Sequence, residues 1–218
     1  MNLADYIGRY WAGAEAIYSV IIAMTFTSVL RGYEPPGETA YLDIVYPALF
    51  CCIAWGIADG LFYAWERRYN IRMENEIIDL SRSIESSDNA LPLIGEQLDD
   101  TILRNISDEK RIQLYRNLVK YLAGAGMKAA PSRRDAISII SATTIISTIA
   151  GLAVVAPFFL VEDVGLALNV SNILGIFLLF VIGCNRAYDK STSDRIIMGL
   201  GTAIIGIVIA AITILLGG

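Results

Sequence analysis

The stretch IIMGLGTAIIGIVIAAITILLGG, residues 196–218, has no charged side chain in 23 residues. A helix of about 20 apolar residues is long enough to cross the hydrocarbon core of a bilayer. Four earlier stretches of similar length are also apolar, and they cover residues 11–30, 44–65, 136–161 and 164–185. The sequence therefore predicts an all-α polytopic membrane protein with five transmembrane helices.

The composition of the 218 residues supports this class and excludes several others. The chain is 55% hydrophobic and 18% charged, whereas a soluble domain is about a quarter charged. It has no histidine, which excludes a Ser-His-Asp triad and His-ligated zinc. The net charge of −5 argues against a nucleic-acid binder. All three cysteines lie inside apolar runs, which argues against a disulfide-stapled secreted domain. The first ten residues do not have the pattern of a cleavable signal peptide.

The lysines and arginines predict the orientation of the five spans. Sixteen of the 17 basic residues lie in the N-terminus, in residues 66–135 and in the loop 186–195, and the other set of flanks holds only Arg31. Cytoplasmic loops of membrane proteins carry the excess of basic residues. The distribution predicts a cytoplasmic N-terminus and an external C-terminus.

The same pattern divides the chain into three parts. Residues 1–65 contain the first two spans, residues 66–135 form a cytoplasmic helical module, and residues 136–218 contain the last three spans. With about 70 residues, the module is small for an independent core. We therefore expect it to pack against a second copy or against the membrane base.

Three helices are expected around this module. The helix of the second span continues to about residue 86, because no Gly or Pro interrupts it. A second helix is expected at about 92–105, and a third at about 108–123 with Ser107 as its N-cap.

Two acids lie inside predicted spans, Glu15 in the first and Asp59 in the second. An ionisable side chain within a bilayer is costly and indicates an ion or proton pathway by default. For Glu15 the alternative is an interfacial acid that reaches headgroup water and pairs with Arg9. For Asp59 the alternative is a buried acid hydrogen-bonded to a neighbouring helix.

Further candidate metal ligands follow Asp59 along the same helix. Tyr63, Glu66 and Met73 lie four, seven and fourteen residues after it, on one helix face. Carboxylate oxygens with one soft sulfur would suit Mn²⁺ or Fe²⁺ better than Zn²⁺. The alternatives are a salt bridge for Glu66 and core packing for Met73.

Glu76 and Asp79 are neighbours on the next turns of the helix. They are either metal ligands or part of a solvated face.

Small residues mark helix-packing faces. The second span has Cys52, Gly56, Gly60 and Ala64 at four-residue spacing, and the last span has Gly206 between Thr202 and Ala210. Such stripes let helices approach closely in membranes. In the third span, Ser141, Thr144, Thr148 and Gly151 share a face, whose hydroxyls either line a polar path or bond back to their own helix.

Several stretches resemble the vacuolar iron transporter family. Residues 13–19, GAEAIYS, resemble the first-span pattern G-A-N-D-G-I-V-S of that family with one residue missing, which places Glu15 at or next to its transport aspartate. Residues 142–159 resemble its third span and residues 199–217 its glycine-rich last span. The second-span signature S-M-A followed by G-E-Y is not reproduced, although Glu66 resembles its glutamate. The resemblance implies a divergent, homodimeric, proton-coupled antiporter that moves Fe²⁺ or Mn²⁺ out of the cytosol.

These observations lead to a functional hypothesis. We expect a multi-pass protein, in a plasma (inner) membrane rather than an organelle membrane, that transports a divalent metal cation. Glu15 and Asp59 would couple metal to protons, and Glu66 would bind metal at the cytoplasmic entry. Neither enzymatic activity nor a permanently bound cofactor is expected. The alternative is a non-transporting membrane scaffold or sensor whose cytoplasmic helices bind a partner.

Overall fold

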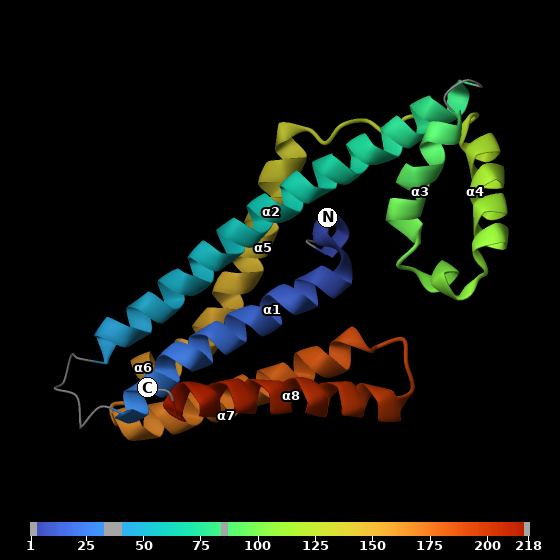
Figure 1. The fold of residues 1–218 in the computed structure, drawn as a ribbon. Coiled ribbons are helices and arrows are strands. Elements are labelled where there is room, and N and C mark those ends of the chain that lie inside the picture. The colour runs from blue at the N-terminus through green and yellow to red at the C-terminus, as the bar shows by residue number, and fades with distance from the viewer. Residues whose placement is uncertain (1–3, 33–40, 84–86, 216–218) are drawn as a thin grey trace. The chain divides into compact units, whose positions relative to one another are not determined.

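The computed structural model describes residues 4–32, 41–83 and 87–215, and every regular element in these ranges is a helix (Figure 1). The α-helices are α1 (Ala4–Ser28), α2 (Leu42–Arg82), α3 (Ala90–Leu98), α4 (Asp108–Leu122), α5 (Arg133–Val155), α6 (Pro157–Leu160), α7 (Val164–Arg186) and α8 (Thr192–Leu215). Short 3₁₀ helices lie at Val29–Gly32, Ser87–Asn89 and Ile102–Asn105. The prediction of an all-α chain is confirmed.

Four of these helices are long and apolar enough to cross a membrane, namely α2, α5, α7 and α8. They identify the chain as a helical integral membrane protein, as expected. The helix α1 covers most of the predicted first span but is not among these four. A fifth span and the orientation of the chain therefore stay predictions.

The chain forms two compact units, which we call the membrane unit (Met1–Tyr63 with Arg134–Gly218) and the helical module (Ala64–Arg133). The module boundaries lie two residues before those expected for residues 66–135. The 41-residue helix α2 is continuous between the two units, as expected from the absence of Gly and Pro between Trp65 and Arg82. It ends at Arg82, and the predicted last residues of this helix, 84–86, lie outside the described residues.

Glycines let the helices of the membrane unit pack closely. A Cβ added to Gly175 of α7 would lie 2.5 Å from the sulfur of Met24 of α1. A Cβ on Gly183 of the same helix would lie 2.9 Å from the Cα of Gly199 of α8. Real Cβ atoms do not approach so closely, so α7 can pack against both neighbours only without side chains at these points. Gly206 of α8 likewise lies against Leu179 of α7.

Two expected helices are interrupted. The apolar run 136–161 does not form one helix, because α5 ends at Val155 and a separate turn begins at Pro157, where the proline has no N–H to continue the ladder. The expected helix at 92–105 is divided into α3 and the 3₁₀ helix at Ile102–Asn105. Thr101 lies between them, and its Oγ1 accepts from the N–H of Leu103 at 3.3 Å.

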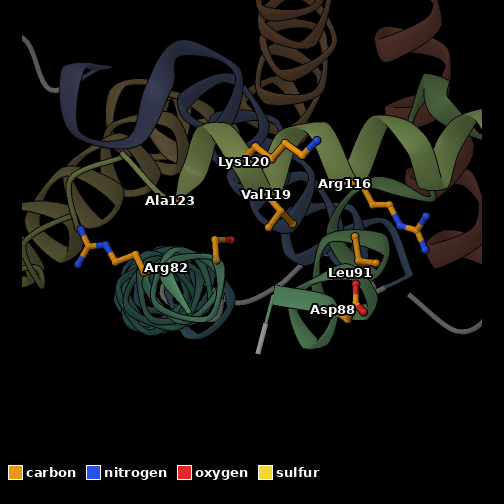
Figure 2. Close-up of a pocket in the computed structure, with 8 residues that line it drawn as sticks. Arg82, Asp88, Leu91, Arg116, Val119, Lys120 and Ala123 are labelled. Atoms are coloured by element: carbon orange, nitrogen blue, oxygen red, sulfur yellow. The ribbon is translucent and has the colours of Figure 1, made fainter. Parts of the chain in front are cut away.

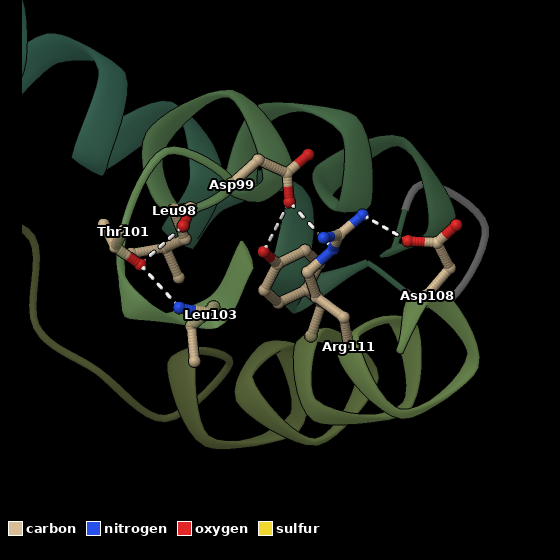
Figure 3. Close-up of polar contacts among 7 residues, drawn as sticks. Leu98, Asp99, Thr101, Leu103, Asp108 and Arg111 are labelled. Atoms are coloured by element: carbon tan, nitrogen blue, oxygen red, sulfur yellow. Dashed lines mark hydrogen bonds and ion pairs between the residues drawn. The ribbon is translucent and has the colours of Figure 1, made fainter. Parts of the chain in front are cut away.

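The helical module has its own small core, in which Ile77, Ile94 and Val119 come from three different helices. Beside it, the buried Tyr115 hydroxyl donates to Oδ1 of Asp99 at 2.7 Å (Figure 3). Arg111 lies 3.1 Å from the same oxygen and 2.7 Å from Asp108. Burial, together with the hydrogen bond and the negative charge of Asp99, raises the pKa of Tyr115 above its ordinary value of 10.0. This network joins the end of α3 to α4.

The segment between α4 and α5 is held along α2. The Asn75 side chain makes two hydrogen bonds of 2.8 Å with the backbone N–H and C=O of Lys128. The Lys128 ammonium lies 2.5 Å from the Glu74 carboxylate, and Arg82 donates to the Ala125 carbonyl at 2.8 Å. These contacts order a segment that has no regular structure of its own.

Candidate functional site

The site is built where α2 and α5 cross at very short range. A Cβ on Gly56 would lie 2.7 Å from the Cα of Thr144, and a Cβ on Gly60 would lie 2.7 Å from the Cα of Ile140. Across the same interface, a Cβ on Gly151 would lie 2.6 Å from the sulfur of Cys52. The small residues at four-residue spacing on α2 thus bring its backbone against α5. Hydroxyl groups on α5 can then reach the carbonyl groups of α2.

Buried hydroxyls line this crossing and extend it to α1. The Thr143 hydroxyl donates to the carbonyl of Gly56 at 2.8 Å, and the Ser147 hydroxyl donates to the carbonyl of Cys52 at 2.5 Å. The Ser19 hydroxyl of α1 donates to the backbone carbonyl of Glu15 at 2.9 Å and also lies 2.5 Å from the Ser147 oxygen. All three hydroxyl residues are buried.

Ser19 and Ser147 have fewer hydroxyl protons than polar contacts within hydrogen-bonding distance. Each hydroxyl carries one proton, yet Ser19 and Ser147 together make one mutual contact and one contact each with a carbonyl. At most two of these three contacts are hydrogen bonds at any moment. The serine pair can therefore redirect a proton without moving a helix, and its oxygen lone pairs can accept from another donor.

Glu15 lies in the interior of the membrane unit beside this pair. Its side chain is 2% exposed, and neither carboxyl oxygen has a hydrogen bond of ordinary geometry with a described residue. Asp59, Ser147 and Trp55 are its polar neighbours. A buried carboxylate without such a bond is costly unless a proton or a cation accompanies it.

The structure therefore places Glu15 of α1 next to Asp59 of α2. Asp59 is half-buried, and it is one of the groups that act electrostatically on Glu15. The sequence offered Arg9 as an alternative partner for Glu15, but the side chain of Arg9 lies outside the part of the chain that the structure describes. Asp59 of α2 and Ser147 of α5 thus bring side-chain oxygens next to the Glu15 carboxyl group of α1.

The other candidate ligands lie on the part of α2 that belongs to the helical module. Glu66, Glu76 and Asp79 are exposed and Met73 is buried. Glu66 follows Asp59 by two helical turns, a rise of about 10 Å. Within the described residues, no group of three or more Asp, Glu or Cys side chains is arranged to hold a metal ion. A cation at Glu15 and Asp59 would have to complete its coordination with hydroxyls, backbone carbonyls or water.

The α5 hydroxyls that the sequence singled out are not the ones that reach α2. Thr144 and Thr148 bond back to carbonyls of their own helix, at 2.7 and 2.6 Å, which was the alternative to a polar path. The hydroxyls that reach α2 belong to Thr143 and Ser147 instead. A signal was present, because Thr143, Ser147 and Gly151 repeat the four-residue spacing of Cys52, Gly56 and Gly60.

Comparison with known proteins adds no family to this description. No protein-family model matches the chain, and no curated protein matches it.

Proposed function

We propose that the membrane unit is a proton-coupled transporter of a divalent metal cation, Fe²⁺ or Mn²⁺, with Glu15 and Asp59 as its coupling pair. The observation that carries the proposal is the buried Glu15 carboxyl group, which has an acidic neighbour and, among the described residues, no hydrogen bond of ordinary geometry to its oxygens. A structural acid at such a position would be expected to have a basic or donor partner. An acid that exchanges ions must instead remain available to them.

The chemistry of two neighbouring carboxyl groups supports exchange. Two carboxylates in an apolar interior repel each other and resist ionising together. One divalent cation or two protons neutralise the pair equally well. The pair can therefore release protons when metal binds and take them up when metal leaves, which is the requirement for an antiporter.

The ligand set supports the choice of ion. Carboxylate, hydroxyl and carbonyl oxygens favour hard and borderline cations such as Mn²⁺ and Fe²⁺. The absence of histidine from the sequence makes a typical zinc or copper site less suitable. The resemblance of residues 13–19 to the vacuolar iron transporters points to the same ions.

The proposed transport direction, the cytoplasmic metal ligands and the oligomeric state rest on the sequence. The basic residues favour a cytoplasmic N-terminus, with metal moving out of the cytosol across a plasma membrane. Glu66 would bind arriving metal, and Met73, Glu76 and Asp79 would collect it. The small module favours a homodimer.

The test is metal flux in proteoliposomes, with a metal-sensitive dye and a pH-sensitive dye inside the vesicles. Fe²⁺, Mn²⁺, Zn²⁺ and Ca²⁺ are compared under an imposed pH gradient. Glu15→Gln and Asp59→Asn keep the shape of each side chain and remove its charge. Each variant is expected to reduce metal flux and coupled proton flux to background. The double variant should be no worse than either single one, because the two groups act as a unit.

Glu162→Gln is the matched control, because Glu162 is an exposed acid between α6 and α7. It should transport at the wild-type rate. Wild-type flux in Glu15→Gln or Asp59→Asn would refute the mechanism. A folded wild-type protein that moves none of the four ions would instead favour the membrane scaffold.

A further inference from the structure

The helical module contains a cavity of about 490 Å³ between the end of α2, the start of α3 and α4 (Figure 2). Leu91 and Val119 give it an apolar surface, and Arg82, Arg116, Lys120 and Asp88 are its charged lining residues. Figure 2 shows Arg82 on one side of the cavity and Arg116 and Asp88 on the other. The volume is in the range of small-molecule sites, about 300–1,000 Å³.

Among the described residues, the lining carries three cations and one acid, although the whole chain has a net charge of −5. Arg116 and Lys120 lie one turn apart on α4, where like charges repel. Among the described residues, neither has an ion pair or a side-chain hydrogen bond. Arg82 has one such bond, to the Ala125 carbonyl, which leaves other guanidinium N–H groups available. An anion between these groups would relieve the repulsion.

We infer that this cavity is a binding site for a small organic phosphate. The apolar or aromatic part of the ligand lies against Leu91 and Val119, and its phosphate group is bound by Arg116 and Lys120 of α4. A phosphate dianion matches several cations better than a single carboxylate does, and guanidinium groups bind phosphate oxygens in a bidentate manner. Asp88 disfavours a long polyanion and can accept a hydrogen bond from a hydroxyl group of the ligand.

The ligand could be a soluble metabolite or the headgroup of an anionic phospholipid, because both present a phosphate ester beside apolar atoms. The test uses phenyl phosphate as the probe and the full-length protein in zwitterionic nanodiscs. Saturation-transfer NMR on the aromatic protons of the probe reports its binding, with empty nanodiscs as the blank. Inorganic phosphate is added as a competitor, and phenol replaces phenyl phosphate in a parallel measurement.

The expected result is saturation of phenyl phosphate that inorganic phosphate reduces, with a much weaker effect on phenol. Arg116→Gln and Lys120→Gln should each weaken binding roughly tenfold, the loss expected for one charge-assisted hydrogen bond. Both residues are exposed, so the variants should fold. Lys110→Gln, an exposed lysine of α4 that does not line the cavity, is the control and should bind as the wild type does.

Phosphatidic acid in the nanodiscs distinguishes the two sources. Competition by this lipid identifies a headgroup, whereas binding of phenyl phosphate unaffected by the lipid identifies a soluble ligand. Equal saturation of phenol and phenyl phosphate, or unchanged binding in the Arg116→Gln and Lys120→Gln variants, would overturn the inference. None of these measurements depends on metal transport, so the proposed function and this site can fail separately.

Discussion

The carboxyl groups of Glu15, in the membrane unit, and Asp99, in the helical module, have opposite surroundings. Asp99 is half-exposed, accepts from Tyr115 at 2.7 Å and lies 3.1 Å from Arg111. Glu15 is buried beside another acid, and its oxygens accept no hydrogen bond of ordinary geometry from the part of the chain that the structure describes. The comparison teaches that the module uses its acids to join helices, whereas the membrane unit joins helices with glycines and hydroxyls.

Breaking the helix contact in the membrane unit should have the largest effect on stability. In Gly60→Ala the new Cβ would lie 2.7 Å from the Cα of Ile140, so α2 and α5 must separate. We expect a loss of about 2 kcal/mol, measured as reduced thermal stability in mild detergent. Gly201→Ala on α8 is the control, because no described atom beyond its own stretch of helix lies within 4 Å of its added Cβ. Equal stability of the two variants would show that the close crossing is not important.

Removing one interhelical hydroxyl should have a smaller effect. Thr143→Val deletes the bond to the Gly56 carbonyl while keeping the shape of the side chain. We expect a loss of about 1 kcal/mol, typical of hydrogen bonds between membrane helices. Thr148→Val is the matched control, because the Thr148 hydroxyl donates to the Thr144 carbonyl of its own helix. If both valine variants melt together, the hydroxyls do not hold α5 to α2.

In the helical module, Tyr115→Phe tests the role of Asp99 as a joining group. The variant loses the 2.7 Å hydrogen bond but keeps the buried ring, so we expect a loss of about 1 kcal/mol. Hydrogen exchange of α3 and α4 in the full-length protein measures it. Unchanged exchange rates would mean that packing alone joins these helices.

The same residue predicts a pH dependence. Its pKa is raised above 10.0 by burial and by Asp99, so the folded module binds the phenolic proton more tightly than the unfolded chain does. The stabilisation is fully present below pH 10 and is lost as pH rises through the folded pKa. The free energy of opening of α3 and α4, obtained from exchange rates corrected for base-catalysed intrinsic exchange, should therefore fall above pH 10. Tyr115→Phe should lack this part of the pH dependence.

Losing the exposed ion pair should have the smallest effect. Glu74 and Lys128 are 2.5 Å apart, but their side chains are 43% and 60% exposed, and water screens such pairs. Glu74→Gln should cost about 0.5 kcal/mol or less in the stability of the module and leave metal flux unchanged. A large loss of flux would mean that this acid, and not only Glu15 and Asp59, takes part in transport.

Much of the fold was predictable because it depends on local patterns. Apolar runs long enough to span a bilayer predicted α2, α7 and α8, and the absence of Gly and Pro after Trp65 predicted that α2 continues into the module. The division of the expected helix at 92–105 was not predicted. There, Asp99 lies against Tyr115 and Arg111 of α4, a contact that helix periodicity does not reveal.

The sequence by itself determined that the chain is helical, which runs are apolar and that Glu15 and Asp59 occur within such runs. Only the tertiary structure decided that these two acids are neighbours, and that Ser19 and Ser147 lie beside them. The reason is that the pairing depends on which faces of α1, α2 and α5 meet. Local periodicity gives each helix an apolar face but does not say which other helix will cover it. Here the glycines of α2 allow close approach to α5, and hydroxyls of α5 donate to carbonyls of α2.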